Sequence, residues 1–279
     1  MSAIDIAYLQ NWVGKVESVS DTITPWQVAA YRATMNEGAG DITPGAAVPQ
    51  GLHWCLALPT VPMSGIGEDG HPERGGFLPP VPLPRRMWAG GRLHFHDDLR
   101  VGDVVTRQST VKSVEYKSGR TGELVFVLVE HQVSTPRGLA ITEEHDIVYR
   151  GLDAPAVGPV ATPEVRTADA SESIDPTPVL LFRYSALTFN GHRIHYDRSY
   201  VTDVEGYPGL IVHGPLQAAL LIKLGNRLKG STLSSFAFRA QKPLFDLAPF
   251  QISGAAEGDK LALWVSDATG HSTMKAHAS

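Results

Sequence analysis

The sequence predicts an α+β protein in which one plan, an apolar helix followed by antiparallel strands, is used twice. Three observations lead to this fold class. β-rich runs separated by glycine-containing turns occur in both halves of the chain, and helical apolar segments precede them. A stretch at 151–178 that is rich in proline, alanine, serine and acidic residues separates the halves. We therefore expect two antiparallel sheets, each wrapping a central apolar helix.

In the first half, residues 1–150, a helix is expected to begin at Thr24 and Pro25. Threonine caps helix N-termini, and proline suits the first helical turn. Residues 51–59, GLHWCLALP, form a second apolar run that fits a short buried helix. The runs that follow predict an antiparallel meander: VVTRQSTVKSVEY, ELVFVLVEHQVST and LAITEEHDIVYR.

In the second half, residues 179–279, we expect residues 179–189 (VLLFRYSALTF) to form a strand. Residues 213–228 (HGPLQAALLIKLGNRL) predict a helix with Pro215 in its first turn. Apolar residues cover most of its circumference, so the helix is buried and its N-terminal N–H groups lie inside the protein. Four further runs predict a second meander: LSSFAFRAQKPLF, FQISGAAEGD, LALWVSDATG and HSTMKAHA.

The composition excludes several classes of function. The chain has 279 residues, 43% of them hydrophobic and 19% charged, as in globular proteins with a core. Net charge is −5 and the basic residues are scattered, which argues against nucleic-acid binding. The single cysteine excludes an internal disulfide or a cysteine-rich zinc site. No signal peptide or bilayer-length apolar run is visible, so we expect a cytoplasmic protein without a membrane partner.

Residues 189–197, FNGHRIHYD, combine two histidines, an Asn-Gly turn signal and an aspartate. The spacing of His192 and His195 allows metal ligation or acid–base chemistry. No third ligand follows at a convincing spacing, and catalytic zinc usually has three protein ligands, so we expect no metal. A general base is the simpler interpretation, because imidazole titrates near neutral pH. Asp197 is expected to orient His195, to point outward or to cap a helix.

Gly214 stands at the start of the predicted buried helix. Without a side chain, it lets a ligand oxygen approach the backbone N–H, where the helix dipole favours negative charge. This arrangement suits an oxyanion hole. The plainer interpretation is that Gly214 and Pro215 only start a helix, and the residues alone leave both open.

The segments YSALTFNGHRIHYD and YPGLIVHGPLQAALL together resemble the MaoC-like hydratases and dehydratases of double hot-dog fold. The similarity is greatest to the mesaconyl-CoA (3-methylfumaryl-CoA) and itaconyl-CoA hydratases and to the type 2 hydroxyacyl-thioester dehydratases. RRMWAGGRLHFHDDLRVGD resembles their degenerate N-terminal hot-dog domain, so the resemblance covers most of the chain. It implies that residues 1–150 form a degenerate, substrate-pocket half, that 151–178 form a linker, and that 179–279 form the catalytic half.

The family motif D-x-N-P-[IL]-H places its aspartate at Asn190, its asparagine at His192 and its histidine at His195 of this chain. The resemblance implies that His195 is the base and that Gly214 supplies the oxyanion hole. Asn190 cannot take a proton, but its amide oxygen can accept a hydrogen bond from the attacking water. The missing acid keeps a non-catalytic acyl-thioester-binding subunit open as an alternative.

The implied reaction is reversible hydration of the α,β double bond of an enoyl-CoA, without a cofactor beyond the coenzyme A of the substrate. A short dicarboxylic acyl group, mesaconyl- or itaconyl-type, needs one further cation, ideally arginine. A type 2 3-hydroxyacyl-carrier-protein or CoA dehydratase is the alternative enzyme, and a thioesterase is disfavoured because the motif lacks a carboxylate. A homodimer is expected by analogy. The candidate substrate-binding residues are Arg85, Arg86, Arg183, Arg193 and His192, followed by Arg198 and Arg239, although a solvated surface position suits most of these arginines.

Overall fold

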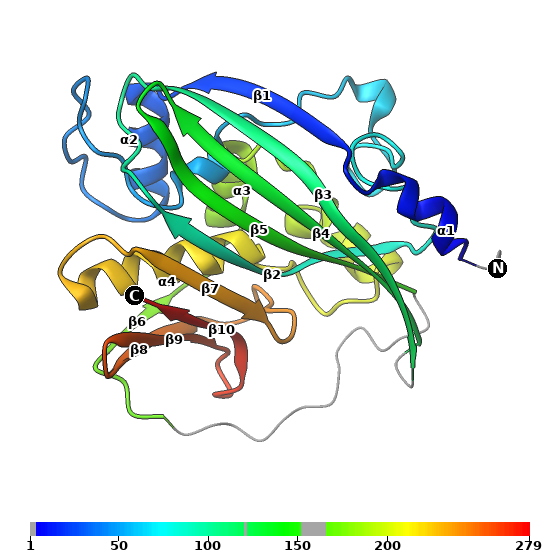
Figure 1. Cartoon of the computed structure of the whole chain (residues 1–279). Coiled ribbons are helices and arrows are strands. Elements are labelled where there is room, and N and C mark those ends of the chain that lie inside the picture. The colour runs from blue at the N-terminus through cyan, green and yellow to red at the C-terminus, as the bar shows by residue number, and fades with distance from the viewer. Residues whose placement is uncertain (1–3, 120–121, 152–165) are drawn as a thin grey trace.

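Within the part of the chain that the structure describes, ten strands form one continuous antiparallel sheet in the order β1-β3-β4-β5-β2-β7-β10-β9-β8-β6 (Figure 1). The computed structural model describes residues 4–119, 122–151 and 166–279. The strand order is symmetric about the β2–β7 pair, so five strands of the second half repeat the connectivity of five strands of the first. The expected α+β plan used twice is confirmed, but the two sheets are joined edge to edge into one.

The N-terminal half of the sheet contains the predicted meander. Its strands are β1 (Val16–Thr22), β2 (Arg85–Phe95), β3 (Val104–Gly119), β4 (Gly122–Thr135) and β5 (Gly138–Arg150). The predicted β-rich runs correspond to β3, β4 and β5, which pair in sequence as antiparallel neighbours. The valines of β4 stand at alternate, buried positions and the residues between them are more exposed, as expected for a strand packed on a core.

The C-terminal half has the strands β6 (Ala170–Ile174), β7 (Ser235–Ala240), β8 (Phe250–Glu257), β9 (Lys260–Ser266) and β10 (Ser272–Ala278). Strand β6 lies in the stretch 151–178, where we expected only a linker, and it pairs with β8. Residues 152–165 of that stretch lie outside the described residues. The halves meet where β2 pairs with β7, from Gly90 opposite Arg239 to His94 opposite Ser235.

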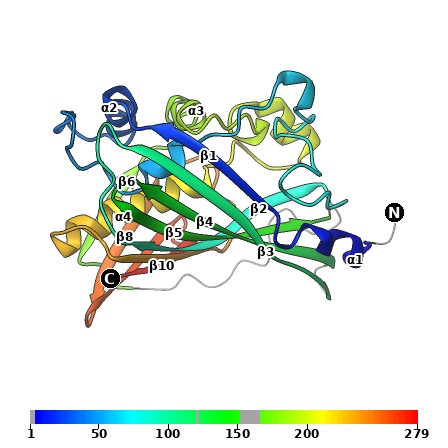
Figure 2. The ribbon, with the colours of Figure 1, turned by 45° about the horizontal axis from the view of Figure 1, so that its top comes forward.

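Each half also has a helix that begins at a Thr-Pro pair, α2 (Pro25–Thr34) and α3 (Pro178–Leu187). Thr24 and Thr177 accept hydrogen bonds from backbone N–H groups of the first turn, which confirms the predicted start of α2. The two helices contact each other and lie side by side over the sheet (Figure 2). The prediction of a strand at 179–189 is therefore wrong. The apolar run is long enough for either element, but the Thr177-Pro178 cap starts a helix there.

Helix α4 (Gly214–Lys229) is the predicted buried helix, and it packs on strands β7 to β10. It ends at Gly230, whose φ of 74° is left-handed, as is common after a helix. The expected central helix of the N-terminal half is reduced, in the described residues, to the four-residue 3-10 helix η2 (Leu52–Cys55). Only the C-terminal five strands thus wrap a long helix.

The main hydrophobic core crosses the β2–β7 seam and includes side chains of both halves, among them Ile23, Leu52, Leu216 and Phe236. A smaller core lies under β3, β4 and β5. The remaining short elements are α1 (Ile6–Leu9), η1 (Gln10–Trp12), η3 (Met63–Gly65), η4 (Arg193–His195) and the π-helical turn η5 (Tyr200–Val204). Among the described residues, no helix has the length and apolar character to cross a bilayer.

Candidate active site

The segment FNGHRIHYD forms the turn that follows α3. Phe189 adopts a left-handed φ of 47°, and the Asn190 N–H donates to Ser185 O at 2.8 Å, so the helix stops and the chain reverses. The Asn190 side-chain oxygen accepts a hydrogen bond from the His192 N–H at 3.0 Å, as asparagine does in many turns. This turn delivers His192 and His195 to the protein interior, at 8% and 7% exposure respectively.

His195 is held in one tautomer by the backbone. Its Nδ1 lies 2.7 Å from the Ile211 carbonyl oxygen. A carbonyl only accepts hydrogen bonds, so Nδ1 carries the proton and Nε2 carries the lone pair. Burial lowers the pKa of His195 from 6.5 to about 4, although the bond to Ile211 opposes this shift. The ring is therefore neutral at neutral pH, and Nε2 is able to accept a proton.

Asp197 does not orient His195. Its carboxylate accepts a hydrogen bond from the Tyr200 N–H at 3.0 Å and pairs with Arg193 at 2.8 Å. It therefore caps the turn η5, which was one of its expected roles, and Ile211 O supplies the orientation of His195.

The N-terminus of α4 opens beside His195. The N-cap residue His213 makes no side-chain cap; its ring stacks on His195 with centroids 3.7 Å apart, and its Nε2 lies 2.8 Å from Ser185 Oγ. A Cβ atom built on Gly214 would have Trp88 O as its nearest contact at 3.9 Å, so the space before this glycine is open. Uncapped N–H groups at a helix start attract negative charge, so this helix end can stabilise an oxyanion.

A cavity of about 560 Å³ brings these groups together. The predicted site residues Asn190, His192, His195 and Gly214 line it from the C-terminal half. Strands β2 and β5 and the loop before β2 line it from the N-terminal half. The size is that of a small-molecule site.

Two of the six candidate arginines, Arg85 and Arg86, line this cavity. Arg85 donates to Glu205 O at 2.9 Å and lies over the Tyr207 ring at 5.3 Å. Arg150 and Lys242, which we did not single out, add two more cations to the lining.

The other predicted arginines do not line the cavity. Arg183 is exposed on α3, because the segment is a helix and not the expected strand. Arg193 pairs with Asp197 and lies over the Tyr200 ring at 4.1 Å. Arg198 pairs with Asp246, and Arg239 lies in β7 opposite Gly90.

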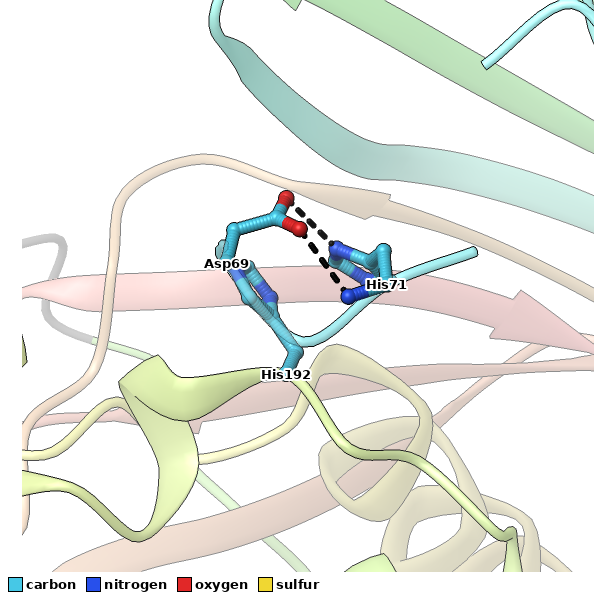
Figure 3. Close-up of side chains that lie close together, drawn as sticks. All are labelled: Asp69, His71 and His192. Carbon is cyan, nitrogen blue, oxygen red and sulfur yellow. Dashed lines mark hydrogen bonds and ion pairs between the residues drawn. The ribbon is translucent and has the colours of Figure 1, made fainter. Parts of the chain in front are cut away.

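The loop before β2 contributes two site residues that the sequence reasoning missed. Asp69 and His71 line the cavity beside His192, and the His71 and His192 ring centroids are 3.9 Å apart (Figure 3). Both Asp69 carboxylate oxygens accept hydrogen bonds from His71, from its N–H at 2.9 Å and from its ring Nδ1 at 3.0 Å. The donor atoms of Asp69, His71 and His192 lie within 4.8 Å of one another, so they also form a candidate metal-ligand group.

His145 lines the cavity from β5 and belongs to a buried network around Glu143. Glu143 is 2% exposed and accepts hydrogen bonds from His145 Nε2 at 2.6 Å, from Trp54 Nε1 at 2.8 Å and from His53 Nε2 at 3.2 Å. Burial alone would raise the pKa of Glu143, but the two histidines hold it well below its usual range. The buried Glu143 carboxylate thus fixes the His145 and Trp54 rings through the hydrogen bonds that it accepts from them.

Two five-strand units of one connectivity are joined edge to edge, the second wraps a buried helix, and a histidine meets that helix's N-terminus in a cavity. This is the architecture of double hot-dog hydratases and dehydratases. Solved structures share this fold. HtdX of Mycobacterium tuberculosis aligns with a TM-score of 0.67 at 21% identity, over 94% of this chain and 99% of that chain. A MaoC-like dehydratase of Phytophthora capsici aligns with a TM-score of 0.71 at 14% identity, over 98% of each chain.

The chain belongs to the hydroxyacyl-thioester dehydratase type 2 family, whose model matches residues 51–246, and it is a hydro-lyase. The mesaconyl-C(4)-CoA hydratase of Chloroflexus aurantiacus is 46% identical over 267 residues, which is 95% of each protein. The mitochondrial hydroxyacyl-thioester dehydratase type 2 of Schizosaccharomyces pombe is 27% identical over 77% of this chain and 79% of its own length.

Proposed function

We propose that the protein reversibly hydrates the α,β double bond of a short dicarboxylic enoyl-CoA of the mesaconyl or itaconyl type. The proposal rests on one observation: His195, the uncapped start of α4 and three arginines line the same cavity. The 46% identity to a mesaconyl-C(4)-CoA hydratase supports the same substrate class. Coenzyme A enters only as part of the substrate, and the proposed chemistry uses no resident cofactor.

In hydration, His195 Nε2 takes a proton from the attacking water while the water oxygen bonds to the β carbon. Negative charge moves to the thioester oxygen as an enolate forms. The Gly214 N–H at the α4 N-terminus stabilises that charge, and one such donor contributes about 3 kcal/mol in comparable acyl-transfer sites. In dehydration, His195 returns the proton to the leaving hydroxyl.

Asn190 positions groups and transfers no proton. One lone pair of its amide oxygen is engaged by the His192 N–H, so the side chain first holds the turn that carries the histidines. The second lone pair and the amide nitrogen are left for a water molecule in the cavity, which the residue lines.

The dicarboxylic specificity rests on Arg86. The carboxylate of a short acyl chain lies only a few bonds from the reacting carbons, so its cation has to lie close to the catalytic histidines. Arg86 lines the same cavity and lies close enough to act on these histidines. Burial is the main cause of the lowered pKa of His71 and of His192, and the positive charge of Arg86 lowers both further. Arg85, Arg150 and Lys242 also line the cavity, and we assign contacts with the coenzyme A phosphates to them.

A type 2 dehydratase acting on 3-hydroxyacyl thioesters is the second candidate, favoured by the family and by the yeast relative. The two candidates share the chemistry and differ in the acyl group. Arginine and lysine side chains line the cavity, and a second carboxylate can pair with one of them whereas an apolar chain cannot, so the lining supports the dicarboxylic substrate.

The test measures loss of the conjugated-thioester absorbance with mesaconyl-CoA, itaconyl-CoA, crotonyl-CoA and a long-chain 2-enoyl thioester. We expect the fastest turnover with a dicarboxylic substrate. His195→Ala should lower kcat by about 10²–10⁴-fold, the usual contribution of a general base, whereas His94→Ala, at an exposed position of β2, serves as the matched control. Preference for the long chain would support the second candidate, and no turnover with any thioester would support a binding subunit.

Arg86→Gln separates the acyl specificity from the chemistry. Loss of a charge-assisted hydrogen bond of about 1.5–3 kcal/mol should lower kcat/KM for the dicarboxylic substrate roughly 10- to 100-fold. The value for crotonyl-CoA, which has no second carboxylate, should change little. An equal loss for both substrates would contradict the role of Arg86 in acyl recognition.

A further inference from the structure

We propose that Asp69 and His71 form a second acid–base pair of the active site, in which Asp69 orients His71 and His71 exchanges a proton with the substrate at the α carbon. This inference rests on the proposed function and adds a catalytic residue to it. Asn190 cannot exchange protons at the position where the family motif has an aspartate, so the site needs its second proton carrier from elsewhere.

The pair reaches the catalytic turn through close backbone packing between the halves. A Cβ on Gly70 would lie 1.9 Å from Gly191 O, and one on Gly191 would lie 2.9 Å from Gly70 O. The Arg193 N–H donates to Asp69 O at 2.9 Å across the same contact. Gly70 has a φ of 87°, so glycine suits both its conformation and its contact. These contacts dock Asp69 and His71 directly beside FNGHRIHYD.

The geometry of the pair leaves one His71 nitrogen available for chemistry. The ring Nδ1–H donates to Asp69, so Nε2 carries the lone pair. Asp69 is ionised at neutral pH: burial raises its pKa, but the hydrogen bonds and charge of His71 bring it to about 2. An ionised carboxylate behind an imidazole stabilises the imidazolium that forms when Nε2 takes a proton.

The His192 ring lies close to both acid–base histidines. Its ring centroid is 3.9 Å from that of His71 and 5.5 Å from that of His195, and all three rings line the cavity. All three rings face the same cavity, so His71 and His195 can exchange a proton through the water that the reaction brings into it.

The proton and electron balance is complete without a co-reactant. In dehydration, His71 Nε2 takes the α-carbon proton, and the C–H bonding pair moves into the enolate at the α4 N-terminus. The pair then forms the α,β double bond while the bond from the β carbon to the hydroxyl oxygen breaks. His71 passes the proton through cavity water to His195, which gives it to the leaving oxygen, so water departs. Hydration reverses these steps, and neither direction changes the proton count of the site.

Two features favour this pair over a metal site at Asp69, His71 and His192. Both carboxylate oxygens of Asp69 already accept hydrogen bonds from His71. The positive charge of Arg86 also lies close enough to affect Asp69, His71 and His192. A cation placed there would share the Asp69 oxygens with existing hydrogen bonds and would meet a like charge.

The experiment compares His71→Gln with the matched control His94→Gln on the best thioester of the panel. His71→Gln should lower kcat by about 10²–10⁴-fold with KM changed less than about threefold. Adding Asn190→Asp to His71→Gln should restore at least about tenfold, because a carboxylate at position 190 returns an acid–base group and still accepts from the His192 N–H. A purely structural defect at position 71 would not be rescued in this way.

Turnover by His71→Gln within about threefold of the wild type would overturn the pair, and so would a double variant as slow as His71→Gln. Metal analysis of the purified protein is the third measurement. One tightly bound metal ion per chain, lost in His71→Gln, would overturn the acid–base role in favour of ligation. A wild type without activity on any thioester would instead refute the proposed function, so the two failures are distinguishable.

Discussion

The buried histidines should make the protein lose stability steeply on mild acidification, and His195 allows the effect to be isolated. The pKa of His195 is about 4 in the folded protein, because burial penalises the charged ring, against 6.5 in an unfolded chain. As the pH falls below 6.5, the unfolded chain binds a proton that the folded protein does not bind. The free energy of unfolding therefore decreases until the pH nears 4, where both states are protonated.

The size of this effect follows from the separation of the two pKa values. The difference between 6.5 and about 4 corresponds to a total of about 3 kcal/mol, of which about 2 kcal/mol is lost between pH 7 and pH 5. Burial also lowers the pKa of His71, His131, His192 and His213, so they act in the same direction. The wild type should therefore lose more stability than His195 alone accounts for.

Urea unfolding of the wild type, His195→Gln and His94→Gln at pH 7, 6 and 5 measures the contribution. Glutamine does not titrate, so His195→Gln should lose about 2 kcal/mol less than the wild type over this range. His94→Gln, at an exposed position, should follow the wild type. Parallel pH curves for the wild type and His195→Gln, with unchanged slopes in urea, would show that His195 is not buried in its neutral form.

Three further predictions concern other parts of the site. The acid limb of kcat/KM for hydration should reflect the His195 pKa near 4 and not the ordinary 6.5; a break at 6.5 would contradict the buried base. Gly70→Ala should displace the loop from Gly191 and lower turnover by more than about tenfold, because catalytic groups are then misplaced. Gly76→Ala is the control, since no atom lies within 4 Å of its new Cβ, and it should leave turnover unchanged. Equal turnover rates of the two variants would refute the docking role of Gly70. Glu143→Gln should cost about 3 kcal/mol in urea unfolding, because it removes the charge that His53, Trp54 and His145 surround; a loss under about 1 kcal/mol would show that the charge is dispensable.

The parts of the fold that could be predicted from the sequence depend on local signals. The meander of β3 to β5 and the helix α4 have strong β-forming runs, glycine turns and helix-start residues within a few positions of one another. The segment 179–189 has an apolar run that suits both a strand and a helix. Its buried positions, Leu181, Tyr184 and Ser185, follow helical spacing, and the Thr177-Pro178 cap was the deciding signal.

The candidate site likewise contains residues with a local sequence signal and residues without one. Asn190, His195 and Gly214 stand in motifs that the sequence shows, and they line the cavity. Asp69 and His71 lie more than 100 residues earlier, in a loop without regular structure. Their placement depends on a backbone contact between Gly70 and Gly191, which no local pattern encodes. Whether an arginine reaches the cavity is likewise a tertiary property, so Arg85 and Arg86 could not be told from Arg183 and Arg193.

One signal in the N-terminal half was available and not used. Glu143 and His145 alternate with Glu144 along a strand, so both point to the same face as the buried Ile141. Two titratable side chains on a core-facing strand surface indicate a satisfied polar network, because such groups are rarely buried without partners.

The β2–β7 seam has a consequence for biosynthesis. Strand β2 ends at Phe95 and its partner β7 begins at Ser235, so on the ribosome one edge of β2 stays open while the intervening chain is made. At roughly 5–20 residues per second, this interval lasts on the order of ten to thirty seconds. An open, nearly continuous strand edge invites pairing with other nascent chains. Although the two halves repeat one plan, a truncated first half should therefore aggregate when it is produced alone. Lower growth temperatures, or chaperones that bind exposed strand edges, should raise the yield of the full chain.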